Sequence, residues 1–180
     1  MSLDCGGKEN YTDELGLNWT PDDYLIYGEA KDISSENETR KQYTSMRLFP
    51  ADSRKYCYKL NVVTRTRYLI RATFLYGDFD SNNVYPKFDI SFGATHWSTI
   101  EIWDTTIEVR ELIFLASSPT IDVCLSNATT GQPFISTLEL RQFNGSVYGT
   151  LYEDRFYLKV SARINFGADS EAPVRYAHIM

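Results

Sequence analysis

Short runs of alternating apolar and polar residues fill the chain from residue 43 onward. Phe88, Ile90 and Phe92 alternate with polar residues, and the same two-residue period recurs in 121–126 and 158–166. A period of two places apolar side chains on one face of a strand. No stretch of 12 residues keeps the apolar stripe of an amphipathic helix. The predicted strands are Tyr43–Phe49, Tyr56–Asn61, Arg67–Tyr76, Lys87–Phe92, His96–Trp103, Glu108–Ala116, Thr120–Ser126, Ile135–Phe143 and Phe156–Phe166.

Turn residues between these runs set the fold class. Clusters of Pro, Gly, Asn, Asp and Ser lie at 50–52, 77–83, 117–119 and 130–133, and such residues favour turns. Many short strands spaced about ten residues apart are typical of an antiparallel β-sandwich or barrel. The first 40 residues are polar and turn-rich, and no strand is assigned to them. We therefore expect an all-β fold.

Length, composition and charge narrow the function classes. The 180 residues, 43% of them hydrophobic, suffice for one domain with a substantial core. A net charge of −6 offers no basic surface for nucleic acid or anionic lipid. The longest apolar runs have about five residues, against about 20 for a membrane-spanning helix. We expect no nucleic-acid partner and no direct membrane insertion. Residues 1–5 lack the features of a secretion signal, so a secreted form would have lost its signal or be a fragment.

Glycosylation sequons indicate the secretory pathway. Asn-x-Ser/Thr occurs at five of the nine asparagines, against about 1.5 by chance. The sites are Asn10, Asn18, Asn37, Asn127 and Asn144, most of them in loop-like surroundings. Because a glycan requires an exposed asparagine, the sequence predicts exposed sites on an extracellular protein.

Three cysteines, Cys5, Cys57 and Cys124, have spacings that match no zinc site. In a cytosolic protein they would be buried thiols, whereas in a secretory protein an odd number leaves one thiol over. Cys57 and Cys124 each fall out of phase with the apolar residues of a predicted strand, and pairing of these strands would bring their Cα atoms within disulfide range. We predict a Cys57–Cys124 disulfide with Cys5 left over. The alternative is a Cys5–Cys57 disulfide with Cys124 as a thiol.

Motifs for catalysis are missing from the sequence. The chain has no G-x-S-x-G, H-E-x-x-H, G-x-x-x-x-G-K-[ST], G-x-G-x-x-G or EF-hand pattern. His96 lies in a strand-like run and His178 near the C-terminus, which fits packed or exposed side chains better than a general base. Asp22 and Asp23 follow Pro21 and are expected to begin a turn. We expect no catalytic residues, no metal site and no cofactor.

The connection after the third predicted strand is the most site-like segment. Aromatic rings can stack on sugar rings, and carboxylates can accept hydrogen bonds from hydroxyl groups. The predicted ligand-binding residues, on one exposed concave patch, are Tyr76, Asp78, Phe79, Asp80 and Tyr85. The alternatives are a polar connection without a ligand, or aromatic plugs folded back over the core.

Several ordered sequence blocks resemble one protein family. They include Asp4-Cys5-Gly6-Gly7, Gly16-Leu17-Asn18-Trp19, Lys55-Tyr56-Cys57-Tyr58, Tyr68-Leu69-Ile70-Arg71-Ala72-Thr73-Phe74-Leu75-Tyr76-Gly77, Tyr85-Pro86-Lys87-Phe88-Asp89 and Arg163-Ile164-Asn165-Phe166-Gly167. Together they are similar to the N-terminal malectin-like extracellular unit of plant leucine-rich-repeat receptor-like Ser/Thr kinases. We therefore assign residues 1–176 to a malectin-like domain and 177–180 to a divergent C-terminal tail. That tail replaces the acidic, proline-containing continuation of the family, so we expect a truncated product, a splice form or an excised domain.

The resemblance implies a jelly-roll-like β-sandwich on the extracellular side of the plasma membrane. In such receptors a second malectin-like unit, leucine-rich repeats, a transmembrane helix and a kinase domain follow. The animal protein malectin binds a glucosylated glycan with aromatic residues; Tyr76 matches one of them, and Gly77 replaces its neighbour. The resemblance thus implies non-enzymatic recognition of a cell-wall carbohydrate or of a peptide or protein ligand, with a co-receptor as a further partner. The alternative is a free-standing secreted carbohydrate-binding module or soluble decoy.

Overall fold

The computed structural model describes residues 1–33, 38–77, 85–144, 147–162, 164 and 166–167, and within them the regular secondary structure is almost entirely β-strand. The predicted all-β class is confirmed. No helix in these ranges is long and apolar enough to span a lipid bilayer. The strands are β1 (Ser2–Asp4), β2 (Tyr11–Thr12), β3 (Asn18–Pro21), β4 (Glu29–Asp32), β5 (Ser45–Leu48), β6 (Lys55–Asn61), β7 (Arg67–Phe74), β8 (Lys87–Phe92), β9 (Thr95–Glu101), β10 (Glu108–Leu115), β11 (Thr120–Thr130), β12 (Phe134–Ile135), β13 (Thr137–Gln142) and β14 (Leu158–Lys159).

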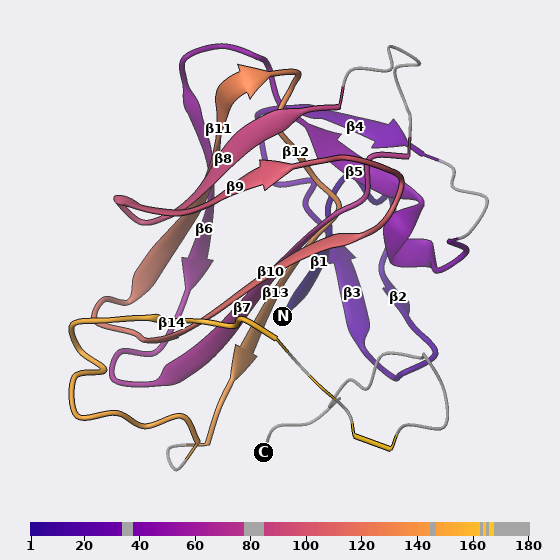
Figure 1. Cartoon of the computed structure of the whole chain (residues 1–180). Coiled ribbons are helices and arrows are strands. Elements are labelled where there is room, and N and C mark those ends of the chain that lie inside the picture. Colours follow the sequence, from indigo (N-terminus) through magenta and orange to yellow (C-terminus); the bar gives the residue numbers. More distant parts are fainter. Residues whose placement is uncertain (34–37, 78–84, 145–146, 163, 165, 168–180) are drawn as a thin grey trace.

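The strands form a sandwich (Figure 1). One layer is a seven-stranded sheet in the order β14-β10-β7-β13-β1-β3-β2. A four-stranded sheet, β6-β11-β8-β9, faces it, and a three-stranded sheet, β12-β5-β4, lies at one side. Neighbouring strands run antiparallel except β1 and β3, which pair in parallel. The predicted antiparallel sandwich is therefore confirmed.

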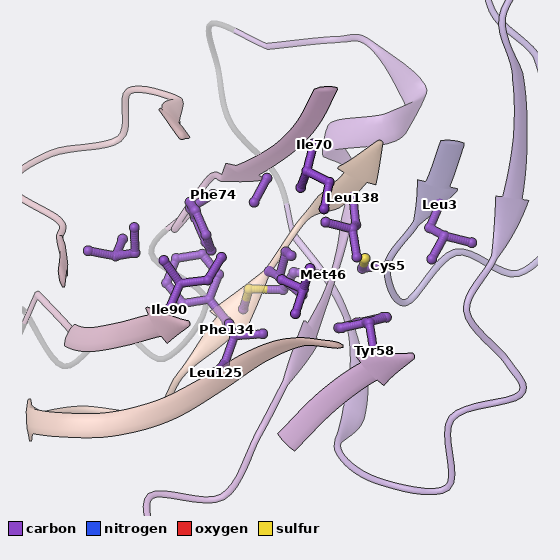
Figure 2. Close-up of a cluster of buried hydrophobic side chains, with 14 of the residues drawn as sticks. Leu3, Cys5, Met46, Tyr58, Ile70, Phe74, Ile90, Leu125, Phe134 and Leu138 are labelled. Carbon is purple, nitrogen blue, oxygen red and sulfur yellow. The ribbon is translucent and has the colours of Figure 1, made fainter. Parts of the chain in front are cut away.

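Side chains from all three sheets share one core. Figure 2 shows Phe74 of β7, Ile90 of β8 and Leu125 of β11 gathered around Phe134 of β12, with Ile70 of β7 beside Leu138 of β13. The Phe74 and Phe134 rings are 6.2 Å apart between centroids. In β6 the predicted alternation holds, since every second residue is buried. Each such large side chain stabilises the fold by about 1.5–3 kcal/mol when it leaves water.

Most predicted strands have somewhat different ends in the structure, and two of them also differ in kind. The segment 43–49 begins with a 3-10 turn, Lys41–Tyr43, before β5. The segment 135–143 is two strands because the chain changes sheets at Ser136, which is fully buried. The Ser136 amide donates to the Thr73 carbonyl oxygen (2.9 Å), and its Oγ accepts from the Leu75 amide (3.0 Å). The Ser136 hydroxyl thus replaces a backbone–backbone hydrogen bond that is lost where the chain passes from one sheet to the other.

Both ends of the described chain also depart from the sequence prediction. The polar first 40 residues contain β1 to β4, which are too short to show a period. In contrast, the described residues of the alternating segment 156–166 form a strand only at β14, and Ile164 and Phe166 are exposed. The predicted strand Phe156–Phe166 is therefore wrong over most of its length, because a two-residue period alone supplies no neighbouring strand.

The predicted disulfide is present. Cys57 of β6 and Cys124 of β11 lie opposite each other, with Cα atoms 4.0 Å apart. In the chain-entropy model, closing a loop of this length stabilises the fold by about 4 kcal/mol. Cys5 is a free and fully buried thiol, as expected.

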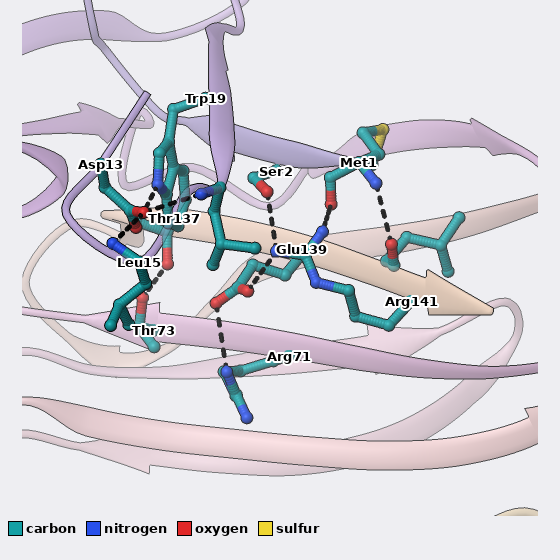
Figure 3. A network of polar contacts seen from close by, with 12 residues as sticks. Met1, Ser2, Asp13, Leu15, Trp19, Arg71, Thr73, Thr137, Glu139 and Arg141 are labelled. Carbon is teal, nitrogen blue, oxygen red and sulfur yellow. Dashed lines mark hydrogen bonds and ion pairs between the residues drawn. The ribbon is translucent and has the colours of Figure 1, made fainter. Parts of the chain in front are cut away.

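A row of charged side chains crosses the outer face of the seven-stranded sheet (Figure 3). Arg71 of β7 lies between Glu111 of β10 and Glu139 of β13 and pairs with both. Arg141 also pairs with Glu139 and donates to Ser2 Oγ (2.7 Å). These charge-assisted bonds tie β1 to the centre of the sheet.

Candidate functional site

The predicted ligand-binding loop is only partly within the described residues. Asp78, Phe79 and Asp80 lie outside them, whereas Tyr76 and Tyr85 flank the gap. Tyr76 is 1% exposed, and its ring contacts those of Tyr85 (5.8 Å) and Phe134 (6.1 Å). The expectation that Tyr76 offers an accessible ring face is therefore wrong, because its ring packs into the core. Ligand binding by the rest of the loop stays a prediction.

Tyr85 instead belongs to an exposed aromatic pair with Trp103. Lys87 of β8 pairs with Glu101 of β9, and the Ile102 amide donates to the Pro86 carbonyl oxygen (3.2 Å). Continuing this antiparallel register places Tyr85 opposite Trp103. Their side chains are 43% and 73% exposed. Sequence reasoning missed Trp103 because it assigned that residue to the end of a strand.

A second exposed surface, not predicted from the sequence, lies between β3 and β4. We call residues 22–28 the β3–β4 turn. Tyr24, Ile26 and Tyr27 are 54%, 84% and 49% exposed, whereas Leu25 packs against the core. The Leu25 amide donates to the Asp22 carbonyl oxygen (3.0 Å), so Asp22 does begin a turn, as predicted. Three large side chains therefore face solvent on one short connection.

A buried ion pair fixes the start of the β3–β4 turn. Asp22 is fully buried, and its carboxylate accepts from the Gly6 amide (2.8 Å) and the Tyr58 hydroxyl (2.7 Å). Arg47 of β5 binds the same carboxylate through two nitrogens. This hydrogen bonding raises the pKa of Arg47. The negative charge of Asp22 is thus neutralised by Arg47. The partners of this carboxylate (Gly6, Arg47 and Tyr58) all come from other strands or connections.

Aromatic packing and a glycine fix the other end of the turn. Tyr27 contacts Tyr56 (5.9 Å between centroids), which stacks on Phe49 (5.2 Å), and Phe49 contacts Tyr58 (6.3 Å). Gly28 has a φ of +79°, and a Cβ there would lie 2.8 Å from the Leu48 carbonyl oxygen. Only glycine suits this approach. The turn is therefore held at both ends by contacts that lead into the core.

Two further ionisable groups are buried near this turn. Asp4 is 2% exposed and accepts a hydrogen bond from Ser45 Oγ (2.9 Å). Burial raises the pKa of Asp4 to about 6. Burial also raises the pKa of the Cys5 thiol, which disfavours a reactive thiolate. Within the described ranges no three His, Cys, Asp or Glu side chains are grouped to hold a metal ion.

The sequon asparagines are exposed wherever the structure describes them. Asn10, Asn18, Asn127 and Asn144 face solvent, and Asn37 lies outside the described residues. Asn127 lies in β11 rather than in the loop-like surroundings suggested by the sequence, and Asn18 lies in β3. Exposure permits glycosylation, which stays a prediction at all five sites.

Comparisons with known proteins give one consistent family. The malectin-like domain family matches residues 3–178. A probable LRR receptor-like serine/threonine-protein kinase of Arabidopsis thaliana is 47% identical over 179 residues, which cover 98% of this chain and 19% of that protein. Another such kinase from the same plant is 39% identical over 171 residues, which cover 83% of this chain and 19% of that protein. The chain thus spans about a fifth of the length of these relatives.

Solved structures share the fold. The ectodomain of ANX2 from Arabidopsis thaliana matches with a TM-score of 0.66 at 16% identity, covering 80% of this chain and 42% of that one. The plant receptor-like kinase FER matches with a TM-score of 0.65 at 17% identity, covering 83% and 43%. A third match, at a TM-score of 0.61 and 15% identity, is a structure of the plant peptide RALF23 in complex with FER and LLG2. The match covers 81% of this chain and 40% of the matched chain.

Proposed function

Because this chain belongs to the malectin-like family, we propose that it is a non-enzymatic recognition domain of an extracellular plant receptor, binding a peptide or protein ligand. The observation that carries this proposal is the β3–β4 turn, a rigidly held connection with Tyr24, Ile26 and Tyr27 exposed. Tyrosine and aliphatic side chains on a pre-organised surface bind proteins with little loss of conformational entropy. The reported complex of FER with a peptide and LLG2 supports the ligand class and a co-receptor partner.

The proposed location is the extracellular side of the plasma membrane, in a receptor whose kinase domain lies outside this chain. Support comes from the receptor kinases that match by sequence and from the ectodomains that match by structure. The Cys57–Cys124 disulfide fits an oxidising compartment, as do the exposed sequon asparagines.

A second candidate function is binding of a cell-wall carbohydrate, in a receptor or in a free-standing module. The exposed Tyr85–Trp103 pair favours it, since flat aromatic faces can stack on pyranose rings. In the sequence Tyr85 follows the segment that contains Asp78, Phe79 and Asp80, which remain proposed ligand-binding residues.

Glycosylated protein from a plant or insect secretory host tests both functions. The immobilised protein is exposed in parallel to a random peptide library and to an array of plant cell-wall oligosaccharides. Selective peptide binding supports the first function. Oligosaccharide binding that Trp103→Ala abolishes, without any peptide binding, supports the second and contradicts the first. Absence of both kinds of binding contradicts both.

A further inference from the structure

The β3–β4 turn has an apolar centre that suits one class of ligand better than others. Ile26 is its most exposed side chain, at 84%, with Tyr24 and Tyr27 on either side in the sequence. An aliphatic side chain cannot stack flat on a sugar ring or bind its hydroxyl groups. It can instead be covered by an apolar side chain of another polypeptide. The centre of this surface therefore favours a peptide over a carbohydrate.

The edges of the same turn are acidic. The charged residues between positions 20 and 30 are Asp22, Asp23 and Glu29, with no lysine or arginine. Arg47 neutralises the buried Asp22, and Lys31 pairs with Glu29 at 2.9 Å. Asp23 is exposed and has no ion pair among the described residues. The Asp23 carboxylate would attract a cationic group of a ligand, whereas it would repel an anionic lipid headgroup.

The turn is also prepared for binding before a ligand arrives. The Asp22–Arg47 pair holds its start, and the contacts of Tyr27 and Gly28 hold its end. A connection held in this way loses little further freedom when a ligand covers it. The net charge of −6 favours approach of a positively charged partner over a distance set by the salt concentration.

We propose that the β3–β4 turn is the docking site for an extended basic peptide segment. An apolar residue of the peptide covers Ile26 between Tyr24 and Tyr27, and a neighbouring lysine or arginine pairs with Asp23. This inference rests on the proposed function and adds the site and the chemistry of the ligand. Binding depends on Ile26 for contact area and on Asp23 for charge.

A positional-scanning library of nonapeptides tests this assignment. Each position is fixed in turn while the others vary, and binding is measured on the glycosylated chain at about 50 mM salt, where screening is weak. We expect enrichment of lysine or arginine next to an aliphatic or aromatic residue. The best peptide should lose about tenfold or more in affinity on Ile26→Ser, as for a hot-spot contact. It should also bind more weakly to Asp23→Asn, and more weakly to the unaltered chain at high salt.

Matched control variants distinguish binding at this site from non-specific binding to exposed apolar or acidic residues. Val63 is an aliphatic residue in the β6–β7 connection with 63% exposure, and Asp154 is an exposed acid near β14. Val63→Ser and Asp154→Asn should leave the affinity unchanged. Enrichment of acidic or uncharged peptides would overturn the inference, and so would binding that Ile26→Ser leaves intact. Either result leaves peptide recognition itself standing, whereas failure of every peptide would contradict the proposed function as well.

Discussion

Two of the segments that expose large apolar side chains differ in how closely the exposed residues are tied to the core. In the β3–β4 turn, Ile26 is exposed while both ends of the turn lead into buried contacts. In the segment 147–159, Leu151 and Phe156 are 94% and 67% exposed. The ends of that segment pack through the ring contacts of Tyr148 with Phe143 and of Tyr157 with Phe92, and the two residues of β14 pair with β10. Between these ends, Glu153 forms an ion pair with Arg67, but Leu151 and Phe156 do not belong to the buried core. Exposure alone therefore does not mark a recognition surface; the contacts behind the exposed residues do.

Removal of the charge of Asp22 should have the largest effect on the stability of the fold. Asp22→Asn leaves Arg47, 8% exposed, without its counter-charge. Loss of one partner of a buried ion pair typically costs 3–5 kcal/mol of unfolding free energy, and we expect a loss of about that size here. Chemical denaturation monitored by tryptophan fluorescence measures the change. The neighbouring exposed Asp23 gives the control, since Asp23→Asn should stay within about 0.5 kcal/mol.

Asp4 should make the stability depend on pH, because it is buried near the Asp22–Arg47 ion pair and has no arginine partner of its own among the described residues. Its pKa of about 6 exceeds the pKa that an aspartate has in an unfolded chain, since burial disfavours the charged carboxylate. The folded state therefore binds the proton more tightly, and stability falls as pH rises from about 4 through 6. Asp4→Asn should remove this dependence and stabilise the fold at pH 7 by up to about 3 kcal/mol. Denaturation midpoints at pH 4.5 and 7 check this; an unchanged pH dependence in the variant would contradict it.

The smallest expected effect is in the segment 147–159. Arg67 pairs with Glu153, and its Nη1 donates to the Val147 carbonyl oxygen (2.7 Å). Arg67→Met keeps most of the apolar stem and removes both contacts. We expect a loss of about 1 kcal/mol or less, since Glu153 is one-third exposed and can be hydrated. Limited proteolysis should nevertheless cut this segment faster in the variant. Equal cleavage rates would show that Arg67 does not hold the segment.

The sequence predicted those parts of the fold that are expressed in local patterns. Strand β6 alternates along its whole length because one face lies in the core, and β8 alternates only up to Ile90, where its register with β9 shifts. The Cys57–Cys124 pair followed from the same alternation. The sheet change at Ser136 has no local signal, since it depends on Thr73 and Leu75 in another part of the chain.

The exposed surfaces were harder to predict for a similar reason. Asp22 resembles any acid that begins a turn, and its burial depends on Arg47 and Tyr58, which are 25 and 36 residues away. Tyr76 looked like a binding residue because it ends a strand beside a polar loop, but the core has room for its ring next to Phe134. Burial is decided by contacts between distant segments, which a residue pattern does not contain.

The β3–β4 turn should be rigid in the unbound protein. Nitrogen-15 relaxation of the backbone amides measures this rigidity, with the amides of residues 151–156 as the internal comparison. We predict order parameters near 0.85 for Tyr24–Tyr27, as in rigid backbone, and clearly lower values for 151–156. Values below about 0.6 in the turn, or values equal to those of 151–156, would contradict the account.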